Sequence, residues 1–252
     1  MKYLLASDFD GTLLRKKQVS EEDRLAIKEW QDQGHIFCLC SGRCPQAGVE
    51  EMKKWGISPD LLITGNGGSA TDMSGNLLFQ HFFPAEHLQA LLERAQEWEC
   101  TGFHLHGKHG EPLIWSTIQP ERTNITWEQA KTVTEFTQFG SNYKGRPDVA
   151  AEFAGWVTKT FPNVTAHING TYIDCTVRGI DKATGVANAA EQFGILPENC
   201  YTIGDNGNDL PMLLAYHGAV IETGNPETIQ KVGKSVPSVA AFIKEILKKR
   251  DA

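Results

Sequence analysis

Short apolar runs alternate with segments of helical periodicity along the first third of the chain. Continuous apolar positions at residues 2–7, His35–Cys40 and Leu61–Thr64 predict three strands that are buried on both faces. Between them, apolar side chains spaced three to four residues apart predict helices over residues 20–33 and from Pro45 to about Gly56. This alternation is typical of a doubly wound α/β fold, in which helices cover both faces of a parallel sheet.

The pattern changes after Pro84 and returns about one hundred residues later. The intervening segment predicts a helix, a hairpin, a second helix and a second hairpin, at residues 84–98, 101–117, 145–161 and 163–177. From Asp181 the α/β pattern resumes, with a helix at 183–193, a strand at Cys200–Gly204, a helix at 209–216 and a strand at 219–221. We therefore expect a core of residues 1–81 and 180–252, with residues 82–179 inserted as an α+β unit.

Composition narrows the classes of partner. The 252 residues carry a formal net charge of −7 and no long basic run, which argues against a nucleic-acid or membrane-surface partner. Six scattered cysteines without a C-x-x-C pair fit reduced thiols better than zinc or redox sites. The N-terminus lacks a signal-peptide pattern and no apolar run approaches the length that spans a bilayer. We therefore expect a cytoplasmic protein, as a monomer or weak homodimer.

The end of the first strand raises a chemical problem. Asp8 and Asp10 follow an apolar run directly, and Gly11-Thr12 follows them. Two neighbouring carboxylates that lose hydration need a cation, a proton or hydrogen-bond donors close by. Because the carboxyl ends of parallel strands meet at one edge of the sheet, we expect residues at the other strand ends, including Ser41 and Asn66, to lie near them.

Further along the chain, suitable partners stand at a fourth strand end. Asp205 and Asp209 flank Asn206-Gly207-Asn208, and together with the first two aspartates they make an oxygen-rich set suited to Mg²⁺. Lys182 offers a positive charge. The alternative for residues 205–209 is a polar loop that caps the next helix.

These residues together resemble the motifs of a known family. Asp8-Phe9-Asp10-Gly11-Thr12, Ser41-Gly42-Arg43, Lys182 and Gly204–Asp209 are similar to the four motifs of the haloacid dehalogenase (HAD) superfamily. The insertion between the second and third motifs resembles the cap of its Cof-type, sugar-phosphatase-like branch (class IIB). In that branch a Gly usually follows the motif lysine, whereas this chain has Ala183, with Gly185 two residues later.

The resemblance implies a role for each motif residue. Asp8 would be the nucleophile that forms an aspartyl-phosphate, and Asp10 the general acid and base, positioned by Thr12. Lys182 would neutralise the nucleophile and phosphate, while Ser41 and the Gly42 amide would bind phosphoryl oxygens. The implied Mg²⁺ ligands are the Asp8 carboxylate, the Asp10 backbone carbonyl, Asp205, and Asp209 directly or through water.

Five further residues are candidates for substrate contact, each with an alternative. Asn66 touches the substrate or only turns the chain, Arg43 binds phosphate or pairs with an acid, and Asn208 contacts the substrate or orients its neighbours. His104 and His106 share one strand face, because alternate residues of a strand point the same way. They would read a substrate hydroxyl or second anionic group, hold a metal with His109, or face solvent.

The leading hypothesis is a Mg²⁺-dependent phosphatase that acts on a small phosphorylated metabolite. By resemblance, sugar phosphates lead, and cofactor phosphates are possible. A phosphomutase or phosphotransferase on the same scaffold is the first alternative, since an aspartyl-phosphate could return its phosphoryl group to another hydroxyl. The other is a non-catalytic sensor of phosphorylated metabolites, against which the intact Asp8/Asp10 pair argues.

Overall fold

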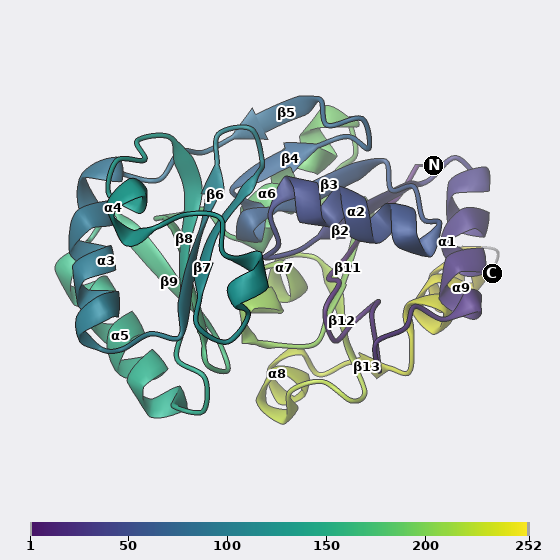
Figure 1. Cartoon of the computed structure of the whole chain (residues 1–252). Helices are drawn as coiled ribbons and strands as arrows, with labels where there is room; N and C mark the ends of the chain where they lie inside the picture. The colour runs from purple at the N-terminus through teal and green to yellow at the C-terminus, as the bar shows by residue number, and fades with distance from the viewer. Residues whose placement is uncertain (1, 251–252) are drawn as a thin grey trace.

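The structure, a computed structural model, describes residues 2–250, with side chains to residue 248. Its larger sheet has eight strands in the order β13-β12-β11-β1-β2-β3-β4-β5 (Figure 1). The six strands from β13 to β3 pair in parallel, and β4 and β5 add an antiparallel edge. Their bounds are β1 Leu4–Ser7, β2 Ile36–Cys40, β3 Leu61–Thr64, β4 Ser69–Thr71, β5 Leu77–Gln80, β11 Cys200–Gly204, β12 His217–Ile221 and β13 Ser235–Val236.

Helices cover both faces of this sheet because its central strands are mostly apolar and are buried along almost their whole length. Leu5 packs with side chains of α1 (Glu21–Asp32), α2 (Pro45–Trp55) and α9 (Val239–Arg250). Its neighbour Leu4 points to the opposite face, toward α6 (Lys182–Gln192) and α7 (Leu210–Ala215). Helix α8 (Pro226–Val232) lies beside α7 and β12. No helix between residues 2 and 250 is long and apolar enough to cross a membrane.

The inserted segment forms a second sheet, which we call the cap sheet. Its antiparallel strands have the order β7-β6-β8-β10-β9. One face packs on α3 (Leu88–Glu97), α4 (Trp127–Ala130) and α5 (Pro147–Thr160), and the other is turned toward the larger sheet (Figure 1). The strand bounds are β6 Gly102–Gly107, β7 Pro112–Ser116, β8 Phe136–Asn142, β9 Val164–Asn169 and β10 Tyr172–Val177.

The predicted α/β class is confirmed, and most predicted elements start and end within two residues of the observed ones. Strand β8 was not predicted, although it lies at the centre of the cap sheet. Its sequence, FTQFGSN, has two aromatic side chains, no other apolar side chain and a glycine, so it carries a weak strand pattern. The short α4 and β13 were also not predicted. The domain boundaries at residues 81/82 and 179/180 stay a prediction.

Candidate active site

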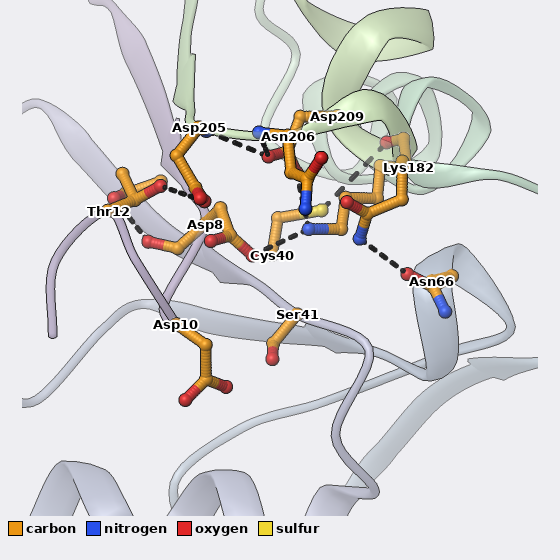
Figure 2. Close-up of polar contacts among 12 residues, drawn as sticks. Asp8, Asp10, Thr12, Cys40, Ser41, Asn66, Lys182, Asp205, Asn206 and Asp209 are labelled. Carbon is orange, nitrogen blue, oxygen red and sulfur yellow. Dashed lines mark hydrogen bonds and ion pairs between the residues drawn. The ribbon is translucent and has the colours of Figure 1, made fainter. Parts of the chain in front are cut away.

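Four parallel strands direct the predicted motif residues to one edge of the larger sheet. Asp8 follows β1, Ser41 follows β2 and Asp205 follows β11, while Asn66 lies in the turn after β3. The register pairs Ser7 with Ile203 and with Leu39, so these strands end level with one another. Figure 2 shows the resulting group of polar side chains. The expected convergence at the strand ends is thus observed.

Lys182 is the cation that compensates the buried aspartates. Its Nζ donates to Asp8 Oδ1 at 2.6 Å and to Asp209 Oδ1 at 2.5 Å, and its side chain is fully buried. Burial alone would lower the pKa of Lys182, but the charges of Asp209 and Asp8 outweigh it and raise this pKa above its usual value. The lysine therefore stays charged between the two carboxylates.

Local structure explains why Lys182 reaches this position. It is the first residue of α6, whose N-terminus is capped by the Asp181 side chain accepting from the Thr184 amide at 2.9 Å. Gly185, in the first turn of the same helix, lies against Ile63 and Gly67. A Cβ on residue 185 would be 2.5 Å from the Ile63 side chain. The glycine two residues after the expected motif position therefore permits the close approach of α6 to β3.

Three carboxylates form a cluster suited to a divalent cation. Oxygens of Asp8, Asp205 and Asp209 lie within 4.8 Å of one another. With Lys182, three negative charges face one positive charge, so two negative charges remain without a counter-charge. Asp8 Oδ2 is buried without a hydrogen-bond partner. This hard oxygen donor set and its charge fit Mg²⁺, which prefers carboxylate ligands.

The pKa values report the same excess of negative charge. Burial raises the pKa of Asp8 well above its usual value, against the opposing charge of Lys182. Burial and the Asp209 charge raise the pKa of Asp205 to about 6. Asp209 is anchored differently, because its Oδ2 accepts from the backbone amides of Asp205 and Asn206 at 2.9 and 3.0 Å. Asp209 therefore holds the 205–209 loop through Oδ2 and Lys182 through Oδ1.

Asp10 lies apart from this cluster. Its carboxylate accepts two hydrogen bonds from Arg43, at 2.7 and 2.8 Å, and points away from Asp8 (Figure 2). Arg43 also approaches Glu51 at 3.4 Å and lies over the Phe9 ring. The two neighbouring aspartates thus have separate cations, and of the two alternatives for Arg43 the structure shows the pairing with an acid.

Of the two ways in which Thr12 is expected to position Asp10, through its hydroxyl or through its backbone, the structure excludes the hydroxyl. It donates to Asp205 Oδ1 at 3.0 Å and so supports the opposite side of the cluster. Asn208 donates to Asn66 at 3.4 Å, which fits a role in orienting its neighbours. Ser41 is buried, and its Oγ accepts from the Arg43 amide at 3.2 Å.

Asn66 joins the core to the cap sheet rather than only turning the chain. It is buried in a left-handed conformation, with φ 52° and ψ 38°. Its Nδ2 donates to Gln138 Oε1 at 3.2 Å and to Asp174 Oδ2 at 3.1 Å. Gln138 in turn donates to the Gly42 carbonyl at 3.3 Å, so the cap contacts the predicted phosphate-binding loop directly.

His104 and His106 share the cap face that is turned toward the core, as expected. Their rings stack with centroids 5.2 Å apart, and both line the cavity described below. The solvated-face alternative is wrong for His106, which is 3% exposed. Burial, together with the His104 charge, lowers the pKa of His106 to about 3, so this ring is neutral near pH 7. Neither ring belongs to a metal-ligating cluster among the described residues.

A cavity of about 460 Å³ lies between the core and the cap sheet. Its core wall includes Asp8, Asp10, Ser41, Gly42, Arg43 and Asn208, and its cap wall includes His104, Ile114, Asn142, Asn169, Tyr172 and Asp174. Lys182 and Asp209 lie behind the core wall, in contact with Asp8. The cavity is thus wide enough for a small metabolite and has an acidic floor.

Sequence reasoning missed three residues of the cap sheet that lie at or beside the site, Gln138, Gly140 and Asp174. Gln138 and Gly140 lie on β8, the strand that was not predicted. Asp174 lies on β10, where the alternation of Tyr172, Asp174 and Thr176 places them on one face. The same argument that grouped the two histidines could have found Asp174.

The fold and this acidic, lysine-bridged site define an enzyme of the phosphatase class. A family profile described as haloacid dehalogenase-like hydrolase matches residues 5–240, and the chain belongs to this family. The resemblance seen in the motifs is therefore confirmed, as is the expectation of an enzyme.

Similar proteins agree in fold and class. The 5-amino-6-(5-phospho-D-ribitylamino)uracil phosphatase YcsE of Bacillus subtilis (strain 168) is 29% identical over 233 residues, covering 90% of this chain and 86% of that protein. YwtE of the same organism, with the same activity in its name, is 27% identical and covers 96% and 97%. The solved HAD subclass IIB sugar phosphatase BT4131 has a TM-score of 0.81 at 18% identity and covers 98% of each chain.

Proposed function

We propose that this protein is a Mg²⁺-dependent phosphatase that hydrolyses small phosphorylated metabolites through an aspartyl-phosphate on Asp8. The observation that carries the proposal is the buried Lys182, whose Nζ bridges Asp8 and Asp209 at 2.6 and 2.5 Å. Burying a lysine and two carboxylates costs desolvation free energy, so this arrangement indicates a function that uses the charges. Phosphoryl transfer needs it, because catalysis rests on positioning and on neutralising negative charge.

In the first step the Asp8 carboxylate attacks phosphorus, and the bond from phosphorus to the ester oxygen breaks. Lys182 holds Asp8 in position and lowers the repulsion between this carboxylate and the phosphoryl group. Asp8, Asp205 and Asp209, with the Asp10 carbonyl, would hold Mg²⁺, which supplies positive charge against the phosphoryl oxygens. Ser41 and the Gly42 amide donate to those oxygens from the core wall of the cavity.

Asp10 enters the reaction as a protonated carboxyl, which donates its proton to the leaving oxygen, and the resulting carboxylate accepts a proton from water in the second step. For this its carboxyl group turns from Arg43 toward the ester. Its side chain is 50% exposed, so the turn does not require a change of the buried core. The attack of water on the phosphoryl group of Asp8 releases phosphate and restores the Asp8 carboxylate and the protonated Asp10 carboxyl.

The substrate is a phosphate ester that fits under the cap. Sugar phosphates and related compounds remain the leading class, and His104 and His106 are the proposed cap contacts. Three Bacillus subtilis relatives carry 5-amino-6-(5-phospho-D-ribitylamino)uracil in their names, so we propose this compound as the first substrate to test. Its ribityl phosphate would enter the cavity with the phosphate toward Asp8.

The test is phosphate release from p-nitrophenyl phosphate and from a panel of phosphorylated metabolites, with Mg²⁺ and with EDTA. We expect activity only with the metal and a loss of at least about a thousandfold in kcat for Asp8→Asn, because the amide is a poor nucleophile. Circular dichroism of the variant checks that it is folded. Phosphate release by Asp8→Asn at the wild-type rate would exclude the mechanism, and activity that is unchanged by EDTA would exclude the metal.

A further inference from the structure

One row of side chains crosses the whole cap face above the candidate active site. The strand register aligns Ile114, His104, Gly140, Asp174 and His167 on five neighbouring strands. Side chains on the opposite face pack with the helices, so this row is directed toward the core. Near the centre of this row, the His104 imidazole and the Asp174 carboxylate lie on either side of Gly140, which has no side chain.

Gly140 allows these two groups to meet across its strand. His104 Nε2 and Asp174 Oδ1 are 3.4 Å apart, although the strands β6 and β10 are not neighbours. A Cβ on residue 140 would lie 2.1 Å from the His104 ring and 2.8 Å from Asp174 Oδ1. A side chain at this position would therefore separate the pair.

The pair is held at a defined place over the predicted phosphate-binding loop. Asp174 Oδ2 accepts from Asn66 Nδ2 at 3.1 Å, and a Cβ built on Gly42 would be 3.3 Å from the same oxygen. Asp174 thus lies next to the loop that includes Ser41 and Gly42. Both partners line the cavity, with 25% of the His104 side chain and 18% of the Asp174 side chain exposed.

The charges of the pair decide what it can bind. Burial would raise the pKa of Asp174, but the hydrogen bond and charge of His104 lower it below its usual value, so Asp174 is a carboxylate. A carboxylate has about four acceptor positions. His104 and Asn66 occupy two of them, which leaves acceptor capacity for a donor from the cavity. The His104 Nε2 atom already lies 3.4 Å from Asp174 Oδ1, so it is not free for a second anion.

We propose that Asp174, held by His104 and Asn66, is a specificity-determining residue that accepts a hydrogen bond from a substrate hydroxyl close to the scissile phosphate. The same carboxylate rejects substrates that carry a second anionic group at that position, because like charges in a partly buried site repel. Of the two kinds of substrate group considered for this face of the cap, a hydroxyl or a second anion, the geometry points to the hydroxyl, with Asp174 as its acceptor and His104 as the residue that positions Asp174. This inference rests on the proposed phosphatase function.

Three matched esters test it with the full chain and Mg²⁺: glycerol 3-phosphate, propyl phosphate and 3-phosphoglycerate. Glycerol 3-phosphate and 3-phosphoglycerate share the C2 hydroxyl and differ at C1, which is a hydroxyl in the first and a carboxylate in the second; propyl phosphate has neither group. For the wild type we expect the highest kcat/KM with glycerol 3-phosphate and the lowest with 3-phosphoglycerate. Asp174→Asn keeps the shape but removes the charge, and we expect it to raise the kcat/KM ratio of 3-phosphoglycerate to glycerol 3-phosphate by about tenfold or more.

His104→Gln provides a second variant if Asp174→Asn does not fold. We expect it to change the same ratio in the same direction, by less, because the Asp174 carboxylate remains but is no longer fixed. Asp148→Asn is the matched control: it removes an exposed carboxylate at the start of α5, and the ratios should stay at the wild-type values. For an ester that is hydrolysed too slowly, its inhibition constant against p-nitrophenyl phosphate hydrolysis gives the same comparison.

The outcomes distinguish failure of the specificity role of Asp174 from failure of the proposed phosphatase function. Ratios for Asp174→Asn and His104→Gln that equal the wild-type ratios overturn the specificity role while the phosphatase function stands. A wild type that prefers 3-phosphoglycerate to glycerol 3-phosphate also overturns it. Failure of the proposed function has a different signature, which is hydrolysis of p-nitrophenyl phosphate by Asp8→Asn at the wild-type rate.

Discussion

The core wall and the cap wall of the cavity are both polar, but they are built in different ways. In the core, Asp8, Asp209 and Lys182 are almost fully buried and hold one another by ion pairs of 2.5–2.6 Å. On the cap, His104 and Asp174 are partly exposed and 3.4 Å apart. The core arrangement fits chemistry that requires fixed charges, whereas the cap arrangement leaves free acceptor capacity. The difference indicates which wall acts on the phosphoryl group and which selects the rest of the substrate.

The largest effect is expected where a buried charge loses its partner. Lys182→Met leaves Asp8 and Asp209 without a counter-charge, and we expect the free energy of unfolding to fall by about 3–5 kcal/mol. Urea denaturation at pH 7 in EDTA measures it. Asp174→Asn, on the cap wall, should cost less than half as much. Equal losses for the two variants would remove the contrast between the walls.

Metal addition separates the walls in another way. If the cluster of Asp8, Asp205 and Asp209 holds Mg²⁺, the ion stabilises the fold by about 2.7 kcal/mol at one hundred times its dissociation constant. We expect the midpoint of thermal unfolding to rise with MgCl₂ and to fall again with EDTA. Asp205→Asn should abolish this response and Asp174→Asn should retain it. A wild type whose midpoint does not respond to MgCl₂ would argue against the site.

The free energy of unfolding is expected to depend on pH through His106, on the cap sheet. Its pKa is about 3 in the folded protein, against 6.5 for a free imidazole, with His104 and Asp174 as the charged groups beside it. Between these values the unfolded chain takes up a proton that the folded protein does not, so stability falls as the pH falls. The slope is about 1.4 kcal/mol for each pH unit below 6.5, and it is absent above that pH.

Urea denaturation of the wild type and His106→Gln at pH 7 and pH 5 measures this contribution. We expect the wild type to lose about 2 kcal/mol more than the variant over this interval. All other titrating groups are common to both proteins, so the difference isolates His106. Parallel losses would mean that the ring takes up its proton normally in the folded state.

The smallest effect on stability is expected at the Arg43–Asp10 pair. Its side chains are 32% and 50% exposed, and exposed ion pairs contribute about 1 kcal/mol or less. Arg43→Ala should therefore change the free energy of unfolding by no more than that amount. Asp10→Asn should be similarly mild for stability but should lower kcat by about a hundredfold or more, because the general acid is lost. A fully active Asp10→Asn would remove Asp10 from the mechanism.

How much the sequence predicted also differs between the walls. Asp8, Ser41 and Asp205 were found because each stands directly after an apolar strand, and parallel strands bring their carboxyl ends to one edge, whereas Lys182, at the start of α6, was found through the family resemblance. Their side-chain contacts were less predictable. Thr12 proved to support Asp205 instead of Asp10, and Arg43 proved to hold Asp10. A hydroxyl or guanidinium has several partners within reach, and only the packed structure selects among them.

The side-chain contacts of the cap wall were harder to predict because they depend on how the strands pair with one another. His104 and Asp174 are 70 positions apart and meet only because β8 lies between their strands and has a glycine at the crossing point. Strand β8 itself was missed, since FTQFGSN has too few apolar positions to indicate a buried strand. Register across an antiparallel sheet is set by the pairing of whole strands, and no local stretch of sequence contains it.

The most direct test is to locate the phosphoryl group during turnover. The wild type and Asp10→Asn are mixed with substrate and Mg²⁺, quenched in acid within the first turnover, digested and analysed by mass spectrometry. The account predicts a phosphoryl group on the peptide that contains Asp8. With p-nitrophenyl phosphate, whose leaving group needs no proton from Asp10, it predicts more of this species in Asp10→Asn, where only the attack of water is slowed. A phosphoryl group on another residue, or substrate turnover by both proteins with none on Asp8, would contradict it.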